Sequence, residues 1–301
     1  MTILSSELTA FLYLVAAVCF ILALKGLGSP KTARRGNLVG AFGALLAMIV
    51  VFLSTELDNI ALILAVIAVG TIIAVPASRM VKMTQMPQLV ALFNGVGGGA
   101  AALVALLELE HSDTIGAFLA VAFTVLIGSI AFSGSVVTFL KLQELMPTRP
   151  IVFPGQAIVI VLLLVVGLAA AAVIVLDEAT LAGLGLAGIK GTAAVVALAV
   201  GLVLGVLLVL PVGGADVPIV ISLLNAGTGL AVAASGLVLS NTLLLVAGTL
   251  VGASGSILTR EMAKAMGRSV AGILFGAFKG GSTAGSTVAS DRPVRSSSAE
   301  D

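Results

Sequence analysis

The chain has 301 residues, of which 59% are hydrophobic and only 10% are charged, and its mean hydropathy is +1.25. Soluble globular chains carry about a quarter charged residues, so this composition excludes a soluble domain held by a single anchor. The net charge of +1 gives no sign of a nucleic-acid partner.

Long apolar runs recur from one end of the chain to the other, and a membrane-spanning helix needs roughly 20 mostly apolar residues. We predict an all-α polytopic membrane protein, a bundle of about nine transmembrane helices, because an open strand edge cannot be satisfied in lipid. The expected spans are residues 8–27, 38–54, 60–77, 89–107, 115–140, 157–176, 192–212, 217–240 and 242–260. The second span is short and begins close to Arg34 and Arg35.

Basic residues segregate in this nine-span arrangement. All but one of the 15 Lys and Arg residues fall on one side, and only Lys190 falls on the other, together with most of the acidic residues. Cytoplasmic loops carry an excess of basic residues. We therefore expect the N-terminus outside and the C-terminus in the cytoplasm.

Polar residues inside the expected spans are neutral and recur at helical spacing. The stretch "ALFNGVGGGAAAL" places Asn94 and Gly98 on one face of the fourth span, and Ser135 and Asn225 share faces with small residues in the fifth and eighth spans. Packing alone would explain the small residues, since they let helix backbones approach and buried Asn or Ser can join helices. Two deep carboxamides can also order a chain of water molecules.

Asp216 lies in "VGGADVPIV", at a turn just before the eighth span. An acid is favourable at a helix N-terminus, so a simple helix cap and a functional role are both open for this residue. His111 lies in a loop with three acids and reads as a solvated side chain. No zinc spacing or Walker loop is present, and "GVGGGA" lacks the strand and the later ribose acid of a dinucleotide fingerprint. We predict no metal site and no cofactor site in this chain.

The composition changes near the C-terminal end. Residues 1–275 read as the transmembrane helical domain, whereas 276–301 are rich in Gly, Ser and Thr and have the composition of a flexible linker. We expect either a disordered tail or a chain that stops where a further domain should begin.

Six motifs taken together resemble a known family. They are "MTQMPQLVALFNGVGGGAAALVA" (83–105), "AFSGSVVTFLKL" (131–142), "RPIVFPGQ" (149–156), "GGADVPIVISLLNAGTG" (213–229), "SNTLLLVAGTLVGASGSIL" (240–258) and "MAKAMGRS" (262–269). In this order they are similar to the membrane domain of the beta subunit of proton-translocating NAD(P) transhydrogenase.

The resemblance implies an activity for the complete complex. It implies an enzyme in which hydride passes from NADH, held by an alpha-subunit domain, to NADP+, held by a C-terminal domain of the beta subunit, while the membrane domain conducts a proton inward. It also implies a multi-pass protein of the bacterial inner membrane and a dimer of the complex. This chain alone is expected to bind no NAD(H) or NADP(H), to hold no catalytic residue for hydride transfer, and to need an alpha subunit.

The resemblance also implies roles for individual residues in the proton pathway and its coupling. Asn94, Ser135 and Asn225 match positions that line the channel. Asp216 matches an acid at the cytoplasmic mouth, and Lys264 and Arg268 match a basic segment that leads to the NADP(H) domain. Because this chain has no histidine in its spans, the proton-carrying histidine is expected from an alpha-subunit helix that packs on the small-residue faces.

A small-solute or ion permease of the inner membrane is the alternative function. Such a transporter would predict an internal repeat and interrupted helices, neither of which the sequence shows. A purely structural anchor for soluble domains would not need two asparagines deep in the membrane.

Overall fold

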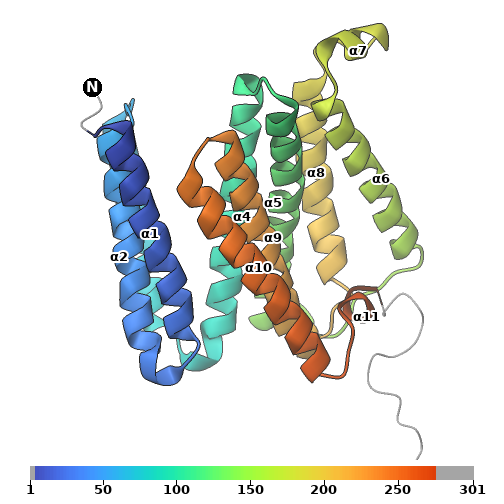
Figure 1. Ribbon diagram of the computed structural model, residues 1–301. Helices are drawn as coiled ribbons and strands as arrows, with labels where there is room; N and C mark the ends of the chain where they lie inside the picture. Colours follow the sequence, from blue (N-terminus) through green and yellow to red (C-terminus); the bar gives the residue numbers. More distant parts are fainter. Residues whose placement is uncertain (1–3, 276–301) are drawn as a thin grey trace, which may run out of the picture.

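The computed structural model describes residues 4–275, and this part of the chain is helical throughout, without a strand. It contains nine helices that are long and apolar enough to cross a membrane, which confirms the predicted all-α polytopic membrane fold. The nine are α1 (Ser6–Leu27), α2 (Pro30–Ser54), α3 (Ile60–Met80), α4 (Met86–Glu108), α5 (Ile115–Leu142), α6 (Gln156–Val175), α8 (Lys190–Val209), α9 (Val217–Val238) and α10 (Thr242–Ala265). Two short helices, α7 (Glu178–Gly183) and α11 (Val270–Phe275), lie at opposite ends of the bundle (Figure 1). The expected linker 276–301 lies outside the described residues.

The largest boundary difference concerns the second span, which was expected from residue 38. In the structure α2 begins at Pro30, and the basic side chains of Lys31, Arg34 and Arg35 are exposed on its first turns. A proline at the first helical position is favourable, because its missing N–H would have no partner there. Hydropathy identifies only the apolar part of a span, whereas the helix extends as far as its backbone hydrogen bonds continue.

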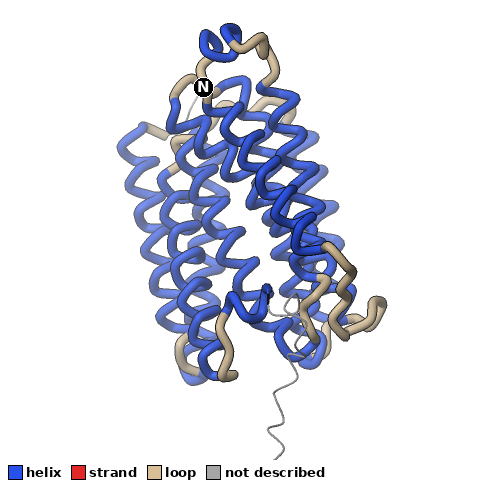
Figure 2. The backbone as a smooth tube through the Cα atoms, turned by 90° about the vertical axis from the view of Figure 1, so that its right-hand side faces the viewer, coloured by secondary structure: helices blue, strands red, loops and turns tan. Residues whose placement is uncertain are grey.

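The long helices run roughly side by side (Figure 2), and α5 lies at the centre of the bundle. It packs against α4, α6, α8 and α9, while α9 also packs against α4 and α10. The α1–α2 hairpin stands to one side and meets the other helices through α10 (Figure 1). No residue of α3 is buried within the described chain. Most of the buried polar side chains belong to α5 and α9, and the helices α4 and α10 that pack against them contribute Asn94 and Thr259.

Glycines allow these four helices to approach closely. A methyl group added at Gly128 of α5 would lie 2.6 Å from the carbonyl oxygen of Gly98 in α4. One added at Gly229 of α9 would lie 2.6 Å from the backbone nitrogen of Gly252 in α10. Such contacts exclude any side chain, and small residues at helix crossings are the usual way to bring backbones together in a membrane.

Lys190 is the one lysine or arginine of residues 4–275 that lies at the end of the bundle opposite the others, and it has a local partner. Nζ of Lys190, at the start of α8, lies 3.7 Å from the centroid of the Phe118 ring in α5. A cation over an aromatic face is stabilised by the ring quadrupole. This contact explains how a single lysine is held at the otherwise acidic end, while the direction of the bundle across the membrane stays a prediction.

Candidate functional site

Asn94 and Ser135, two of the residues expected in the proton pathway, meet between α4 and α5. The Asn94 Nδ2 group donates a hydrogen bond to Ser135 Oγ over 2.9 Å, and both side chains are buried. Gly95 makes room for this pair, since a methyl group there would lie 3.0 Å from Ser135 Cβ. The asparagine and the glycines in the middle of the fourth span thus serve one arrangement, a close crossing of α4 and α5 that contains a neutral polar pair.

Two buried acceptors near this pair have no protein partner. Asn94 Oδ1 and Thr228 Oγ1 are both buried without a hydrogen bond in the described part of the chain. Thr228 comes from α9 and lies beside Gly98, because a methyl group at Gly98 would be 3.2 Å from its hydroxyl oxygen. Gly98 is one helical turn from Asn94. Thr228 was not among the predicted site residues, although its spacing from Asn225 put it near the same stripe.

Asn225 is half-buried in α9, one turn before Thr228, and its side chain makes no hydrogen bond with the described residues. Ser222, by contrast, is used in packing. Its hydroxyl donates to the carbonyl of Gly255 in α10 over 3.2 Å and is 3.0 Å from Thr259 Oγ1. The polar face of α9 therefore divides into a packed part and a part with unused hydrogen-bonding capacity.

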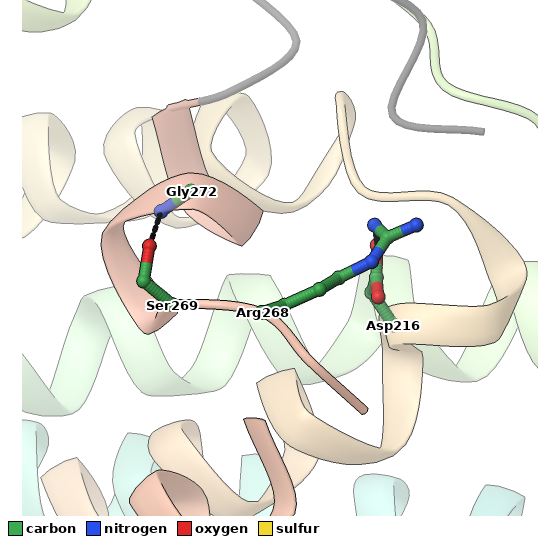
Figure 3. Close-up of polar contacts among 4 residues, drawn as sticks. All are labelled: Asp216, Arg268, Ser269 and Gly272. Atoms are coloured by element: carbon green, nitrogen blue, oxygen red, sulfur yellow. Dashed lines mark hydrogen bonds and ion pairs between the residues drawn. The ribbon is translucent and has the colours of Figure 1, made fainter. Parts of the chain in front are cut away.

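Asp216 and Arg268, which were predicted at the mouth, form an ion pair. Arg268 Nη1 donates to Asp216 Oδ2 over 2.6 Å, and the two side chains are 28% and 6% exposed (Figure 3). Asp216 precedes α9 but makes no side-chain capping bond to it. The second carboxylate oxygen, Oδ1, is buried without a partner. The structure thus shows a buried, charge-assisted pair in place of the simple helix cap that was left open.

The local sequence places Arg268 opposite Asp216. Gly267 follows the last turn of α10 with a φ of +67°, and its N–H donates to the carbonyl of Lys264 over 3.0 Å. The Arg268 N–H donates to the carbonyl of Ala263 over 2.9 Å. These two bonds are the Schellman ending of a helix, in which glycine adopts the left-handed conformation. The chain turns at Gly267, and the next side chain points at Asp216.

Lys264, the other predicted basic residue, does not join this pair. It is exposed on the last turn of α10. A cation there is favourable because of the helix dipole. Of the six predicted site residues, four form two pairs, Asn94 with Ser135 and Asp216 with Arg268, while Asn225 and Lys264 belong to neither.

The same end of the bundle contains a buried lysine that was not among the predicted site residues. Lys141, near the end of α5, is fully buried, and its Nζ lies within hydrogen-bond distance of three backbone carbonyls at the end of α8 and just after it. A lysine at the end of an apolar run usually extends to the interface, so its position in the sequence gave no signal for burial.

The small-residue faces, where a partner helix was expected, are occupied within the chain. Gly95 and Gly98 of α4 contact α5, and Gly248 and Gly252 of α10 contact α9. These glycine faces thus already contact helices of the same chain.

No group of three or more His, Cys, Asp or Glu side chains that could hold a metal ion occurs among the described residues. His111 is exposed at the end of the short turn that follows α4. "GVGGGA" is in the middle of α4, without the strand that precedes a phosphate-binding turn. The glycines of "GVGGGA" therefore do not form a phosphate-binding turn.

Comparison with known proteins gives one consistent result. A family model described as the NAD(P) transhydrogenase beta subunit matches residues 9–301. The chain is similar to the NAD(P) transhydrogenase subunit beta of Rhodospirillum rubrum, with 39% identity over 98% of this chain and 64% of the relative. A sequence from a named strain of that species gives the same values. The chain thus spans somewhat less than two thirds of the length of these relatives.

Proposed function

This chain belongs to the NAD(P) transhydrogenase beta subunit family, and from that membership we propose that it forms the proton-conducting membrane domain of the complex. Its role would be to couple inward movement of a proton to hydride transfer from NADH to NADP+. Hydride transfer itself would take place on soluble domains that hold NAD(H) and NADP(H), outside the described residues.

The observation that carries this proposal is the ion pair between Asp216 and Arg268. Burying a carboxylate is costly unless it is paired, and here the partner extends from the segment that follows the last span. A change in the charge of Asp216 would weaken the pair and release Arg268. The pair can therefore connect a proton event at the membrane to the segment beyond α10.

Polar groups along α9 would mark a path for the proton between Asp216 and the inside of the bundle. Asp216 stands at its start, Asn225 lies on the order of 13 Å further along the helix axis, and Thr228 one turn beyond. Thr228 lies beside α4 at Gly98, one turn from the Asn94–Ser135 pair. The unpartnered oxygens of Asn94 and Thr228 could each bind a water molecule. Asn94, Asn225 and Thr228 are all uncharged.

This arrangement lacks a group that could itself hold and release a proton beside Asn94. The alpha subunit that the family implies would supply it, as a histidine on a membrane helix. We propose that the complex is a dimer in the bacterial inner membrane, with the end of α10 facing the cytoplasm. Near that end Lys264 and Arg268 would adjoin an NADP(H)-binding domain.

The alternative of a permease is not favoured by any observation. Each of the nine described spans is one continuous helix, whereas discontinuous helices form the substrate sites of many secondary transporters.

The proposal is tested by replacing Asp216 with asparagine in the complete complex. In membrane vesicles, NADP+ reduction by NADH and the accompanying proton movement are measured, together with hydride exchange between nucleotide analogues, which needs no net proton movement. We expect Asp216→Asn to abolish the coupled reaction while exchange and assembly are retained.

Glu261→Gln is the matched control, because Glu261 is an exposed acid on the last turns of α10. It should leave both reactions unchanged. Near-normal coupled activity of Asp216→Asn at matched protein levels would overturn the proposal.

A further inference from the structure

Lys141 is the largest fully buried side chain in the described part of the protein, and the proposed proton pathway does not use it. It lies on the last turn of α5, and the carbonyls near its Nζ belong to the segment that leads from α8 to Asp216. Its Nζ is 3.2 Å from the carbonyl oxygen of Val209, 2.5 Å from that of Leu210 and 2.8 Å from that of Val212.

These three carbonyls explain why a lysine can be buried here. The last carbonyls of a helix have no partner within the helix, and α8 ends at Val209. Pro211 follows and has no N–H to satisfy a neighbouring carbonyl. An ammonium group has three donors and no acceptor, which matches the three oxygens. Its positive charge also lies at the negative end of the α8 dipole.

No carboxylate pairs with Lys141 within the described residues. The lysine therefore acts on backbone alone, and the backbone that it fixes leads directly to Asp216. Val212 precedes the turn Gly213–Asp216, in which the Asp216 N–H donates to the Gly213 carbonyl over 2.9 Å. Two further bonds hold this connection from outside: the Gly214 N–H donates to the Thr148 carbonyl, and the Ile151 N–H donates to the Leu210 carbonyl, each over 3.0 Å.

We propose that Lys141 is a positioning residue for coupling: it fixes the turn between α8 and α9 so that Asp216 is presented to Arg268. This inference rests on the proposed function, since it assigns Lys141 a role through Asp216. Lys141 bonds carbonyls just before the turn Gly213–Asp216, and the Asp216–Arg268 pair holds the end of the turn. Without the lysine, the Val212 carbonyl loses the donor that holds it, while the carbonyls of Val209 and Leu210 keep only the N–H groups of Val212 and Ile151. The turn can then move so that the carboxylate no longer meets the guanidinium.

Gln156 provides a matched control. It is also buried, and its Nε2 donates to the carbonyl of Leu207 over 3.0 Å, on the last turn of the same helix. Its bond lies before the turn, so it stabilises the end of α8 without fixing the segment that leads to Asp216. A purely structural role for Lys141 would make the two residues equivalent.

The test compares Lys141→Met, Lys141→Arg and Gln156→Leu in the complete complex at matched protein levels. The readout is the ratio of coupled NADP+ reduction to uncoupled hydride exchange between analogues. We expect Lys141→Met to lower this ratio about tenfold with exchange unchanged, Lys141→Arg to retain at least about a third of it because donors remain, and Gln156→Leu to leave it within about twofold.

An unchanged ratio in Lys141→Met, or an equal fall in Gln156→Leu, would overturn the inference. If Lys141→Met does not assemble, Lys141→Gln keeps an amide donor and is measured instead. We then expect the ratio for Lys141→Gln to be below that for Lys141→Arg. A wild-type ratio for Lys141→Gln would overturn the inference. Asp216→Asn is measured beside these variants. If Asp216→Asn stays coupled, the proposed function fails. If Asp216→Asn is uncoupled and Lys141→Met stays coupled, only the role of Lys141 fails.

Discussion

The Asn94–Ser135 pair and the Asp216–Arg268 pair differ in charge and in depth. Asn94 and Ser135 form a neutral pair inside the bundle between α4 and α5, whereas Asp216 and Arg268 form a charged pair where α9 begins and α10 ends. Both are largely buried, and both leave one oxygen of the asparagine or aspartate without a partner. A neutral pair costs little to bury, while an ion must be paired or close to water.

The difference indicates two kinds of contribution to function. Asn94 and Ser135, the inner pair, offer hydrogen-bonding groups that do not gain or lose a proton. Asp216 and Arg268, the outer pair, change their net charge when the Asp216 carboxylate is protonated, and the interaction between them then weakens. Mutations should therefore affect coupling more strongly at the outer pair and packing more strongly around the inner pair.

The first prediction tests whether the outer pair faces the cytoplasm, and its outcome is all or none. After replacement of the single cysteine, Cys19, new cysteines are placed at Ser112 and at Ala265, which lie at opposite ends of the bundle. Because basic residues remain in the cytoplasm, an impermeant thiol reagent added outside should label position 112 only. Labelling of position 265 alone would reverse the orientation.

The second prediction concerns the charge of the outer pair. Arg268→Gln leaves the Asp216 carboxylate buried without its cation, which is strongly destabilising for such pairs. We expect coupled NADP+ reduction to fall by about tenfold or more, equivalent to about 1.4 kcal/mol, with hydride exchange retained. Lys264→Gln, which alters an exposed cation on the last turn of α10, should have a smaller effect. Equal rates for the two variants would remove the distinction between them.

The third prediction tests the packing around the inner pair. A side chain at Gly98 would lie 3.0 Å from both Ala131 Cβ and the Gly128 carbonyl oxygen. Gly98→Leu should therefore destabilise the complex by about 1–3 kcal/mol, the usual cost of overpacking. Gly70→Leu is the control, since nothing lies within 4 Å of a methyl group added at that position. Thermal unfolding of the purified complex measures both, and similar melting temperatures would contradict the close crossing of α4 and α5.

The fourth prediction has the smallest effect. Asn94→Leu removes the hydrogen bond to Ser135, and interhelical hydrogen bonds in membranes contribute about 0.6–1 kcal/mol. We expect a loss of about threefold to fivefold in coupled rate. Ser254→Ala is the control, because the exposed Ser254 hydroxyl bonds only to its own helix. A loss at Asn94 as large as that at Asp216 would show that the inner pair is not a minor contributor.

The candidate site was only partly accessible from the sequence. The motif around Asp216 and the segment around Arg268 were recognisable, but their pairing spans 52 positions in the chain. Lys141 and Thr228 were not recognised as candidates. Their significance depends on which face of α5 or α9 meets a neighbour, and hydropathy does not specify the rotation of one apolar helix against another.

The sequence by itself determined the number of spans, their helical nature and the ends of several helices, because these depend on local properties. The length of an apolar run sets a span, the lack of water compels helix formation, and Gly267 ends α10. Only the tertiary structure decided that Asn94 meets Ser135 across 41 positions and that Lys141 reaches Val212 across 71. Such contacts follow from how the helices pack around α5, where glycines at the crossings let particular backbones approach and bring distant polar groups within bonding distance.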